Sequence, residues 1–291
     1  MSLTTVLNGF GISLGDGIIG LQALSVARAT GAIQGRVVLG RTEPSAKPLL
    51  PQLYERATDL AEIWPMDLAP RDGQVIDIRD FAHDPAFARI SMIDFFLAKL
   101  GINPHAISSD EKRNRWLAPR MAPLPDMGLP TGYVLLCPKA SIALRDMPPE
   151  AHLALQLGLA ARGFGPVVTQ GEPVEGAIAA PFCPSIEALA ALVAGARAVV
   201  STDTAILHLA DAYSVPCLAL MTTHRPEWRV RDYPYCLPYR LPVTGVPESA
   251  EFVRGPEDLA AVRAAWFSDG AGLGWVGPLL DQFVAFAAAR A

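Results

Sequence analysis

The sequence of 291 residues lacks several features that would each point to a definite class of protein. No uninterrupted apolar run approaches the roughly 18–20 residues that a helix needs to cross a bilayer. The N-terminus has neither the basic start nor the apolar core of a secretory signal. The formal net charge of −5 argues against a nucleic-acid-binding protein with a broad basic face. We therefore expect a cytoplasmic protein with no transmembrane segment and no nucleic-acid partner.

The motifs of several common site chemistries are also missing. There is no D-x-D pair and no C-x-x-C pair. The run GFGISLG fits a dinucleotide fingerprint only in part, because Leu14 stands at its last glycine position. The histidines have no spacing typical of metal ligands; they are His83, His105, His152, His208 and His224. We expect no bound metal and no cofactor.

Strand-like and helix-like segments alternate along most of the chain. Hydrophobic residues make up 51% of the sequence and charged residues 18%, which is enough apolar material for extensive cores. This alternation predicts an α/β fold with parallel sheets covered on both faces. The expected strands are 4–8, 36–40, 74–79, 133–138, 166–171, 197–202 and 216–221; the expected helices are 17–30, 52–64, 90–102, 149–163, 185–196, 205–214 and 277–291.

A proline-rich stretch interrupts the alternation at residues 118–132. Four prolines in this stretch disfavour both a helix and a central strand, which indicates a linker. We therefore predict two Rossmann-like domains, residues 1–125 and 126–291, that face each other across a cleft. The final helix is expected to pack back on the N-terminal domain.

The segment VVSTDTAILHLADAYSVPCLAL, residues 199–220, places polar residues between two apolar runs. Ligands of parallel α/β sheets bind where strands end and helices begin. Asp203 and Thr204 are predicted in such a turn, with Ala205 opening a helix whose free amides favour an anion such as a diphosphate. His208 is expected near the same mouth. Two other interpretations stay open: Asp203 as a helix N-cap and His208 as a core histidine.

This segment resembles the D-[ST]-G-x-x-H-L-A-x-A-x-x-x-P motif of glycosyltransferase family nine, the ADP-heptose:lipopolysaccharide heptosyltransferases. Three further stretches are similar to the family in the same order. They are SLGDGIIGLQAL near the N-terminus, CPKASIALRDMPPEAHLALQLGLAARGFGPVVTQG from residue 137, and PSIEALAALVAGARAVV before the D-T motif. In this chain Ala205 stands where the family has glycine, and Arg145 where it has lysine.

The resemblance implies a GT-B fold and the inverting, metal-independent transfer of a sugar. Asp16 takes the position of the family's proposed base, and the neighbouring Ser13 and Gly15 face the acceptor. Capping of the first helix is the alternative role of Asp16. The donor diphosphate is expected to contact seven residues: Lys139, Ser141, Arg145, Asp203, Thr204, Ala205 and His208. A solvated surface pair is the alternative for Lys139.

The resemblance also implies the partners. The donor is a nucleotide-diphosphate sugar, with an ADP-sugar favoured and heptose as the family's default. The acceptor is a lipopolysaccharide-type glycan or glycolipid, which makes peripheral contact with the inner membrane a further expectation. Two alternatives remain: a non-catalytic GT-B relative that binds a nucleotide sugar or a protein, and a nucleotide-sugar epimerase. The loop 223–236 either closes over a ligand or is a structured surface loop.

Overall fold

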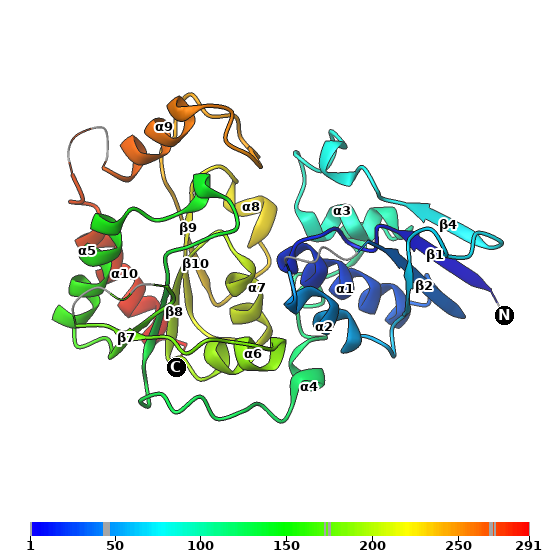
Figure 1. Ribbon diagram of the computed structural model, residues 1–291, viewed down its shortest axis with the longest axis horizontal. Helices are drawn as coiled ribbons and strands as arrows, with labels where there is room; N and C mark the ends of the chain where they lie inside the picture. Colours follow the sequence, from blue (N-terminus) through cyan, green and yellow to red (C-terminus); the bar gives the residue numbers. More distant parts are fainter. Residues whose placement is uncertain are drawn as a thin grey trace. The chain divides into compact units, whose positions relative to one another are not determined.

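The computed structural model describes residues 2–42, 47–171, 173, 176–267, 270 and 272–290, and the chain divides into two compact units (Figure 1). Unit 1 comprises Met1–Leu124, Pro184–Glu187 and Glu227–Tyr233. Unit 2 comprises Pro125–Cys183, Ala188–Pro226 and Pro234–Ala291. The main division falls between Leu124 and Pro125, inside the proline-rich stretch. Two short segments of the C-terminal half nevertheless belong to unit 1, which the sequence does not reveal.

Unit 1 is built on a parallel sheet with the strand order β3-β2-β1-β4. Helix α1 packs against both α2 and α3. The elements are β1 Leu3–Leu7, α1 Leu14–Ala29, β2 Arg36–Arg41, α2 Leu49–Glu55, β3 Glu62–Pro65, β4 Gln74–Asp77, η1 Phe81–His83, α3 Met92–Lys99, η2 Pro104–Ala106 and α4 Ala118–Met121.

The second half of the predicted helix 52–64 is wrong. Helix α2 ends at Glu55, and Glu62–Pro65 form strand β3. Ile63 and Trp64 favour strands over helices, and they pair in register with Leu39 and Gly40 of β2. Pairing with β2 at the edge of the sheet thus makes this segment a strand, although its apolar spacing alone favours a helix.

Unit 2 is built on a parallel sheet with the order β10-β9-β8-β5-β6-β7. The elements of the C-terminal half are β5 Val134–Cys137, η3 Ala143–Arg145, α5 Pro149–Ala161, β6 Val167–Thr169, β7 Ile178–Ala179, α6 Ile186–Ala194, β8 Ala198–Thr202, α7 Ala205–Ala212, β9 Cys217–Met221, α8 Pro226–Arg229, β10 Cys236–Arg240, α9 Pro256–Trp266 and α10 Val276–Ala288. The parallel α/β prediction is confirmed. Strands β7 and β10 and helices α8 and α9 were not predicted.

The central strands β5, β8 and β9 are buried along their whole length. This is expected of parallel strands with helices on both faces. One face packs against α5, α9 and α10 in a single apolar cluster, and α6 and α7 lie on the other (Figure 1). Edge strand β10 contains Pro238, which is tolerated because an edge strand needs no donor on its outer side.

The terminal helix α10 belongs to the core of unit 2. Leu280 and Phe283 pack against Leu155 and Leu159 of α5, and the ring of Phe283 lies edge-on to Phe164 at 6.0 Å. The expected return of this helix to the N-terminal domain is therefore replaced by packing on α5. Its apolar stripe finds a partner inside its own unit.

Segment Glu227–Tyr233 joins unit 1 through buried ion pairs. Asp94, 8% exposed, contacts Lys112 Nζ at 2.8 Å and Arg231 Nη1 at 2.7 Å. Burial alone would raise the pKa of Asp94, but hydrogen bonds from Arg231 and Lys112 outweigh burial and hold it below its ordinary value. Tyr233 adds a hydrogen bond, accepting at 2.7 Å from the amide of Asn114.

The turn from β1 into α1 depends on a glycine of the helix. Phe10, with φ 65°, is 1% exposed, and it belongs to a group of packed phenylalanine rings with Phe96 at 5.3 Å. A Cβ at Gly20 would lie 2.0 Å from Cγ of Phe10. Only glycine at this position lets the Phe10 ring pack against the helix.

We expect Gly20→Ala to lower the free energy of unfolding by about 1–3 kcal/mol, because the added methyl overpacks the Phe10 contact. Chemical denaturation measures this change. Gly277→Ala is the matched control, since a Cβ there would meet only Arg162 Nη2 at 3.8 Å; its stability should be unchanged or higher. Equal stability of Gly20→Ala and the parent protein would contradict the packing argument.

Candidate functional site

Four neighbouring strands of unit 2 end at the same edge of the sheet. Strands β5, β8, β9 and β10 are adjacent and parallel, so the loops that follow them lie side by side. The loop after β5 carries Arg145, the turn after β8 carries Asp203, and the loop after β9 carries His224. The chain from 241 to 255, after β10, carries Glu251. This is the edge where ligands of parallel sheets bind.

These four residues form one group of ion pairs, here called the Arg145 cluster. Asp203 Oδ2 lies 3.6 Å from Arg145 Nη1 and 2.9 Å from His224 Nδ1. Glu251 contacts the same two side chains through their other nitrogen atoms. Its Oε2 lies 2.5 Å from Arg145 Nη2, and its Oε1 lies 3.1 Å from His224 Nε2.

The members of the Arg145 cluster differ in exposure. The side chains of His224, Asp203 and Arg145 are 0%, 4% and 11% exposed, whereas that of Glu251 is 44% exposed. The guanidinium of Arg145 is paired with two carboxylates, those of Asp203 and Glu251. Buried charges are tolerated when they are paired in this way.

Helix α7 begins where the sequence predicts, but Asp203 is not its N-cap. Thr204 is the N-cap, and its Oγ1 accepts a hydrogen bond from Ile206 N at 3.2 Å. Ala205 is the first helical residue. The carboxylate of Asp203 contacts Arg145 and His224, so the alternative of Asp203 as the cap is wrong. His208 lies one turn further and is 3% exposed.

The loop after β5 fixes the position of Arg145, whereas Lys139 on the same loop pairs with Asp146. Thr222 Oγ1, at the end of β9, donates to the carbonyl of Leu144 at 2.8 Å, which anchors the short helix η3 beside β9. Lys139 is 67% exposed and contacts Asp146 at 3.0 Å. The structure therefore brings Arg145 and Asp203 together, whereas Lys139 and the exposed Ser141 lie on the same loop toward solvent.

A buried histidine marks the neighbouring strand end. His152 Nε2 lies 2.9 Å from Thr169 Oγ1, the last residue of β6. Burial first, and the charge of Lys139 second, lower the pKa of this imidazole. His152 is therefore neutral near pH 7 and adds no charge to this edge.

Unit 1 holds the remaining predicted residues at the start of α1. Ser13 is the N-cap, and its Oγ accepts from Asp16 N at 3.2 Å. Gly15 and Asp16 lie in the first turn, and Asp16 is half-buried. The alternative of Asp16 as the cap of a helix near Gly17 is wrong, because the helix begins at Leu14. The catalytic role of Asp16 stays a prediction.

The loop before α1 is held by residues that the sequence analysis did not identify. The hydroxyl of Tyr54 donates to the carbonyl of Gly9 at 2.6 Å, and Arg41 Nη1 donates to the same carbonyl. The guanidinium of Arg41 lies 3.6 Å from the centroid of the Tyr54 ring. Lys47 Nζ donates to the carbonyl of Ile12 at 2.9 Å.

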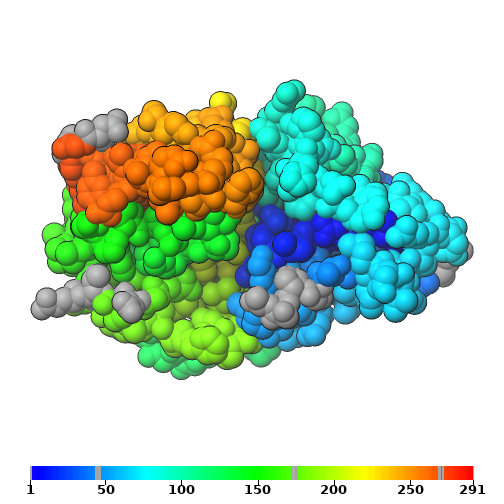
Figure 2. Space-filling view, turned by 45° about the horizontal axis from the view of Figure 1, so that its top comes forward, coloured from blue at the N-terminus to red at the C-terminus, as the bar shows by residue number. Residues whose placement is uncertain are grey.

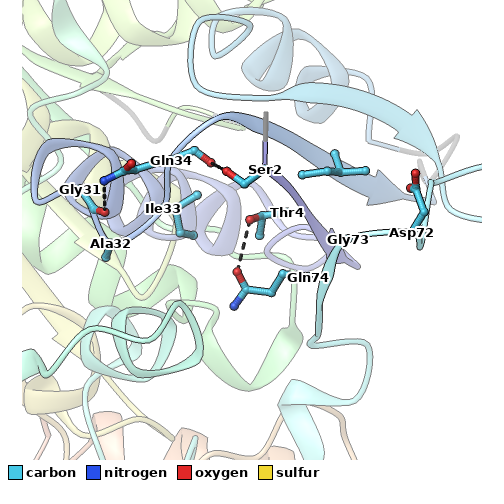
Figure 3. A pocket seen from close by; sticks show the side chains of 10 residues that line it. Ser2, Thr4, Gly31, Ala32, Ile33, Gln34, Asp72, Gly73 and Gln74 are labelled. Atoms are coloured by element: carbon cyan, nitrogen blue, oxygen red, sulfur yellow. Dashed lines mark hydrogen bonds between the residues drawn. The ribbon is translucent and has the colours of Figure 1, made fainter.

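A hollow of about 560 Å³ lies at the opposite end of the unit 1 sheet (Figure 3). It is lined by residues at the amino ends of β1 and β4, including Thr4 and Gln74, which hydrogen-bond to each other at 3.4 Å. Ser2 Oγ donates to Gln34 O at 2.9 Å. These polar groups hydrogen-bond to one another. Ligands of parallel sheets bind at the carboxyl ends of the strands, so we do not assign the functional site to this hollow.

Part of the chain that contains most of this cluster matches a known protein family. Residues 109–235 match the model of glycosyltransferase family 9 (heptosyltransferase). The matched segment contains Arg145, Asp203 and His224. The resemblance to glycosyltransferase family nine is confirmed over this segment, which is less than half of the chain. Asp16 and Glu251 lie outside the matched segment. No curated protein matches the chain significantly.

Solved structures share the fold across nearly the whole chain. The iron-containing heptosyltransferase TibC, in complex with ADP-D-β-D-heptose, matches with a TM-score of 0.65 at 13% identity, over 98% of this chain and 76% of that one. Escherichia coli ADP-heptose LPS heptosyltransferase II matches at 0.54 and 14%, over 92% and 99%. E. coli heptosyltransferase WaaC, with ADP-2-deoxy-2-fluoro heptose, matches at 0.53 and 15%, over 98% and 99%. These neighbours establish the GT-B fold.

Two negative findings apply to the part of the chain that the structure describes. Within the described ranges, no group of three or more His, Cys, Asp or Glu side chains has a geometry that could hold a metal ion. None of the helices traced in these ranges is both long and apolar enough to span a membrane.

His224 and Glu251 were not predicted as members of the cluster. His224 lies three residues after the end of strand β9, and its position near a strand end was the available signal. Glu251 lies ten residues or more beyond β10, in a stretch without helix or strand. Nothing in the local sequence relates it to Arg145.

We expect Asp203→Asn to lower the free energy of unfolding by about 3–5 kcal/mol, because it leaves buried positive charge uncompensated. Asp281→Asn is the matched control: it breaks an ion pair with Arg162 in which Asp281 is 71% exposed, and it should cost at most about 1 kcal/mol. Urea denaturation compares the two. A loss no larger for Asp203→Asn than for the control would contradict the proposed importance of the buried pairs.

Proposed function

We propose that the protein transfers a sugar from a nucleotide-diphosphate sugar to a hydroxyl group of a glycan or glycolipid. The observation that carries this proposal is the Arg145 cluster at the carboxyl edge of the unit 2 sheet, beside the start of helix α7. The side chains of Arg145 and His224 lie there on loops that follow strands β5 and β9, in the segment that matches the family model. The preferred donor is ADP-heptose, because TibC and WaaC were solved with ADP-heptose or its analogue.

The leaving diphosphate is assigned to Arg145, His224 and the N-terminus of α7. A guanidinium can bind two diphosphate oxygens at once and stays charged throughout. The first turn of α7 adds the positive end of the helix dipole. Positive charge fixed in advance stabilises the negative charge that develops as the bond to the sugar breaks. Lys139, Ser141 and His208 complete the proposed donor set, and transfer is proposed to be independent of metal.

Asp16 is proposed as the general base. The oxygen of the acceptor hydroxyl bonds to the anomeric carbon, the bond from that carbon to the diphosphate oxygen breaks, and the hydroxyl proton passes to the Asp16 carboxylate. Attack from the side opposite the leaving group inverts the configuration. Ser13 fixes the first turn of α1 by capping it, which holds Asp16 in a constant orientation.

The donor site is tested by calorimetric titration of ADP. We expect the parent protein to bind ADP in preference to UDP and GDP, and Arg145→Ala to weaken ADP binding by about 1.5–3 kcal/mol, the value of a charged hydrogen bond. Arg162→Ala is the control, because Arg162 pairs with the exposed Asp281 and should leave the affinity unchanged. Undiminished affinity in Arg145→Ala would remove this residue from the donor site.

The base is tested by Asp16→Asn. We expect the rate of sugar transfer to a lipopolysaccharide-core acceptor to fall by about 10²–10⁴-fold, the usual contribution of a general base, with ADP affinity unchanged. Asp59→Asn provides the control, since Asp59 is an exposed carboxylate of unit 1 paired with Arg120. A transfer rate in Asp16→Asn close to that of the control would exclude Asp16 as the base.

A further inference from the structure

Glu251 is held differently from the other members of the Arg145 cluster. Arg145, Asp203 and His224 follow strands β5, β8 and β9 closely and are nearly buried. Glu251 is 44% exposed and lies in the stretch 241–255, which contains no helix or strand. Figure 2 shows the orange part of the chain, which includes this stretch, at the surface. Glu251 is therefore the member that can leave without disturbing a strand.

An anion could replace both contacts that Glu251 makes. Its two carboxylate oxygens act separately: one lies 2.5 Å from Arg145 Nη2 and the other 3.1 Å from His224 Nε2. The side chains of Arg145 and His224 are nearly buried, and a buried polar group that loses its partner is costly. The oxygens of a diphosphate offer the same pattern of contacts.

We propose that Glu251 occupies the diphosphate position in the ligand-free protein and that the donor displaces it on binding. This inference rests on the proposed donor site at Arg145. The Glu251 carboxylate then competes with anionic ligands for the position beside Arg145 and His224. A ligand enters only if its contacts outweigh those of the Glu251 carboxylate.

The contacts around Glu251 define how far the displacement extends. On one side, Ser249 N donates to the carbonyl of Thr223 at 2.8 Å. On the other side, Arg254 N and Nε donate to Asp258, each at 2.9 Å. Between these two anchors Phe252 is 69% exposed, so little packing opposes movement. A rearrangement confined to residues 250–253 would release Glu251 while both anchors stay in place.

The expected effect on affinity follows from competition for one position. A ligand that must first displace an internal group binds with an apparent affinity reduced by the fraction of protein in which the position is open. If that fraction is about one tenth or less, removing the carboxylate raises the affinity for a diphosphate by about tenfold or more.

Calorimetric titration with ADP and with inorganic pyrophosphate tests the competition. We expect Glu251→Gln and Glu251→Ala to bind both ligands about tenfold or more tightly than the parent protein does. Glu257→Gln is the matched control, because it removes one exposed carboxylate six residues further along the chain and should leave both affinities unchanged. Thermal unfolding of each variant verifies that it is folded. Equal or weaker binding by both Glu251 variants, with clear binding by the parent protein, overturns the inference and leaves the donor site intact.

Hydrogen exchange separates displacement from a simple change of charge. We expect the backbone amides of residues 250–253 in the parent protein to exchange faster when ADP is bound. Unchanged or slower exchange would overturn the displacement, even if the Glu251 variants bind more tightly. If neither the parent protein nor any variant binds ADP or pyrophosphate, the proposed donor site itself fails, and the inference fails with it.

Discussion

Parallel pairing of β8 with both β5 and β9 is the constraint on which the candidate site depends. Because the three strands run in the same direction and are buried along their length, the residues that follow them meet at one edge. Arg145 and Asp203 are separated by more than fifty residues in sequence and yet lie 3.6 Å apart. Thr222 reinforces this convergence by its hydrogen bond to the backbone of η3. The position of the cluster thus follows from strand direction before any side chain is considered.

Strand direction also explains which parts of the fold were predictable. The central strands of unit 2 are continuous apolar runs, and β5 and β8 are followed by the predicted helices α5 and α7, so the pattern identifies them. Strand β3 was taken for helix because Ile63 and Trp64 also satisfy a helical spacing, and only their pairing with β2 decides the matter. Helix α10 was predicted as a helix, but its partner was not, because an apolar stripe does not specify which surface covers it.

The residues of the candidate site likewise differ in whether the sequence indicates them. Asp203, Thr204 and Arg145 lie next to recognisable strand ends, and their motif carries family information. Glu251 reaches the cluster from a stretch whose path depends on tertiary contacts such as Ser249 to Thr223. Arg41 and Tyr54 hold the loop before α1. From sequence, Arg41 is only the residue after a predicted strand, and Tyr54 is a helix residue. Their shared contact with Gly9 exists only in the folded protein.

The membership of Glu227–Tyr233 in unit 1 bears on how the two halves of such a protein can be recombined. A chimaera joined at Leu124 would take Asp94 and Lys112 from one parent and Arg231 and Tyr233 from the other. The Arg231–Asp94 salt bridge and the Tyr233–Asn114 hydrogen bond would then have to form between sequences that did not evolve together. An exchange of donor specificity between relatives should therefore transfer residues 125–183, 188–226 and 234–291, and retain residues 184–187 and 227–233 with their native N-terminal unit.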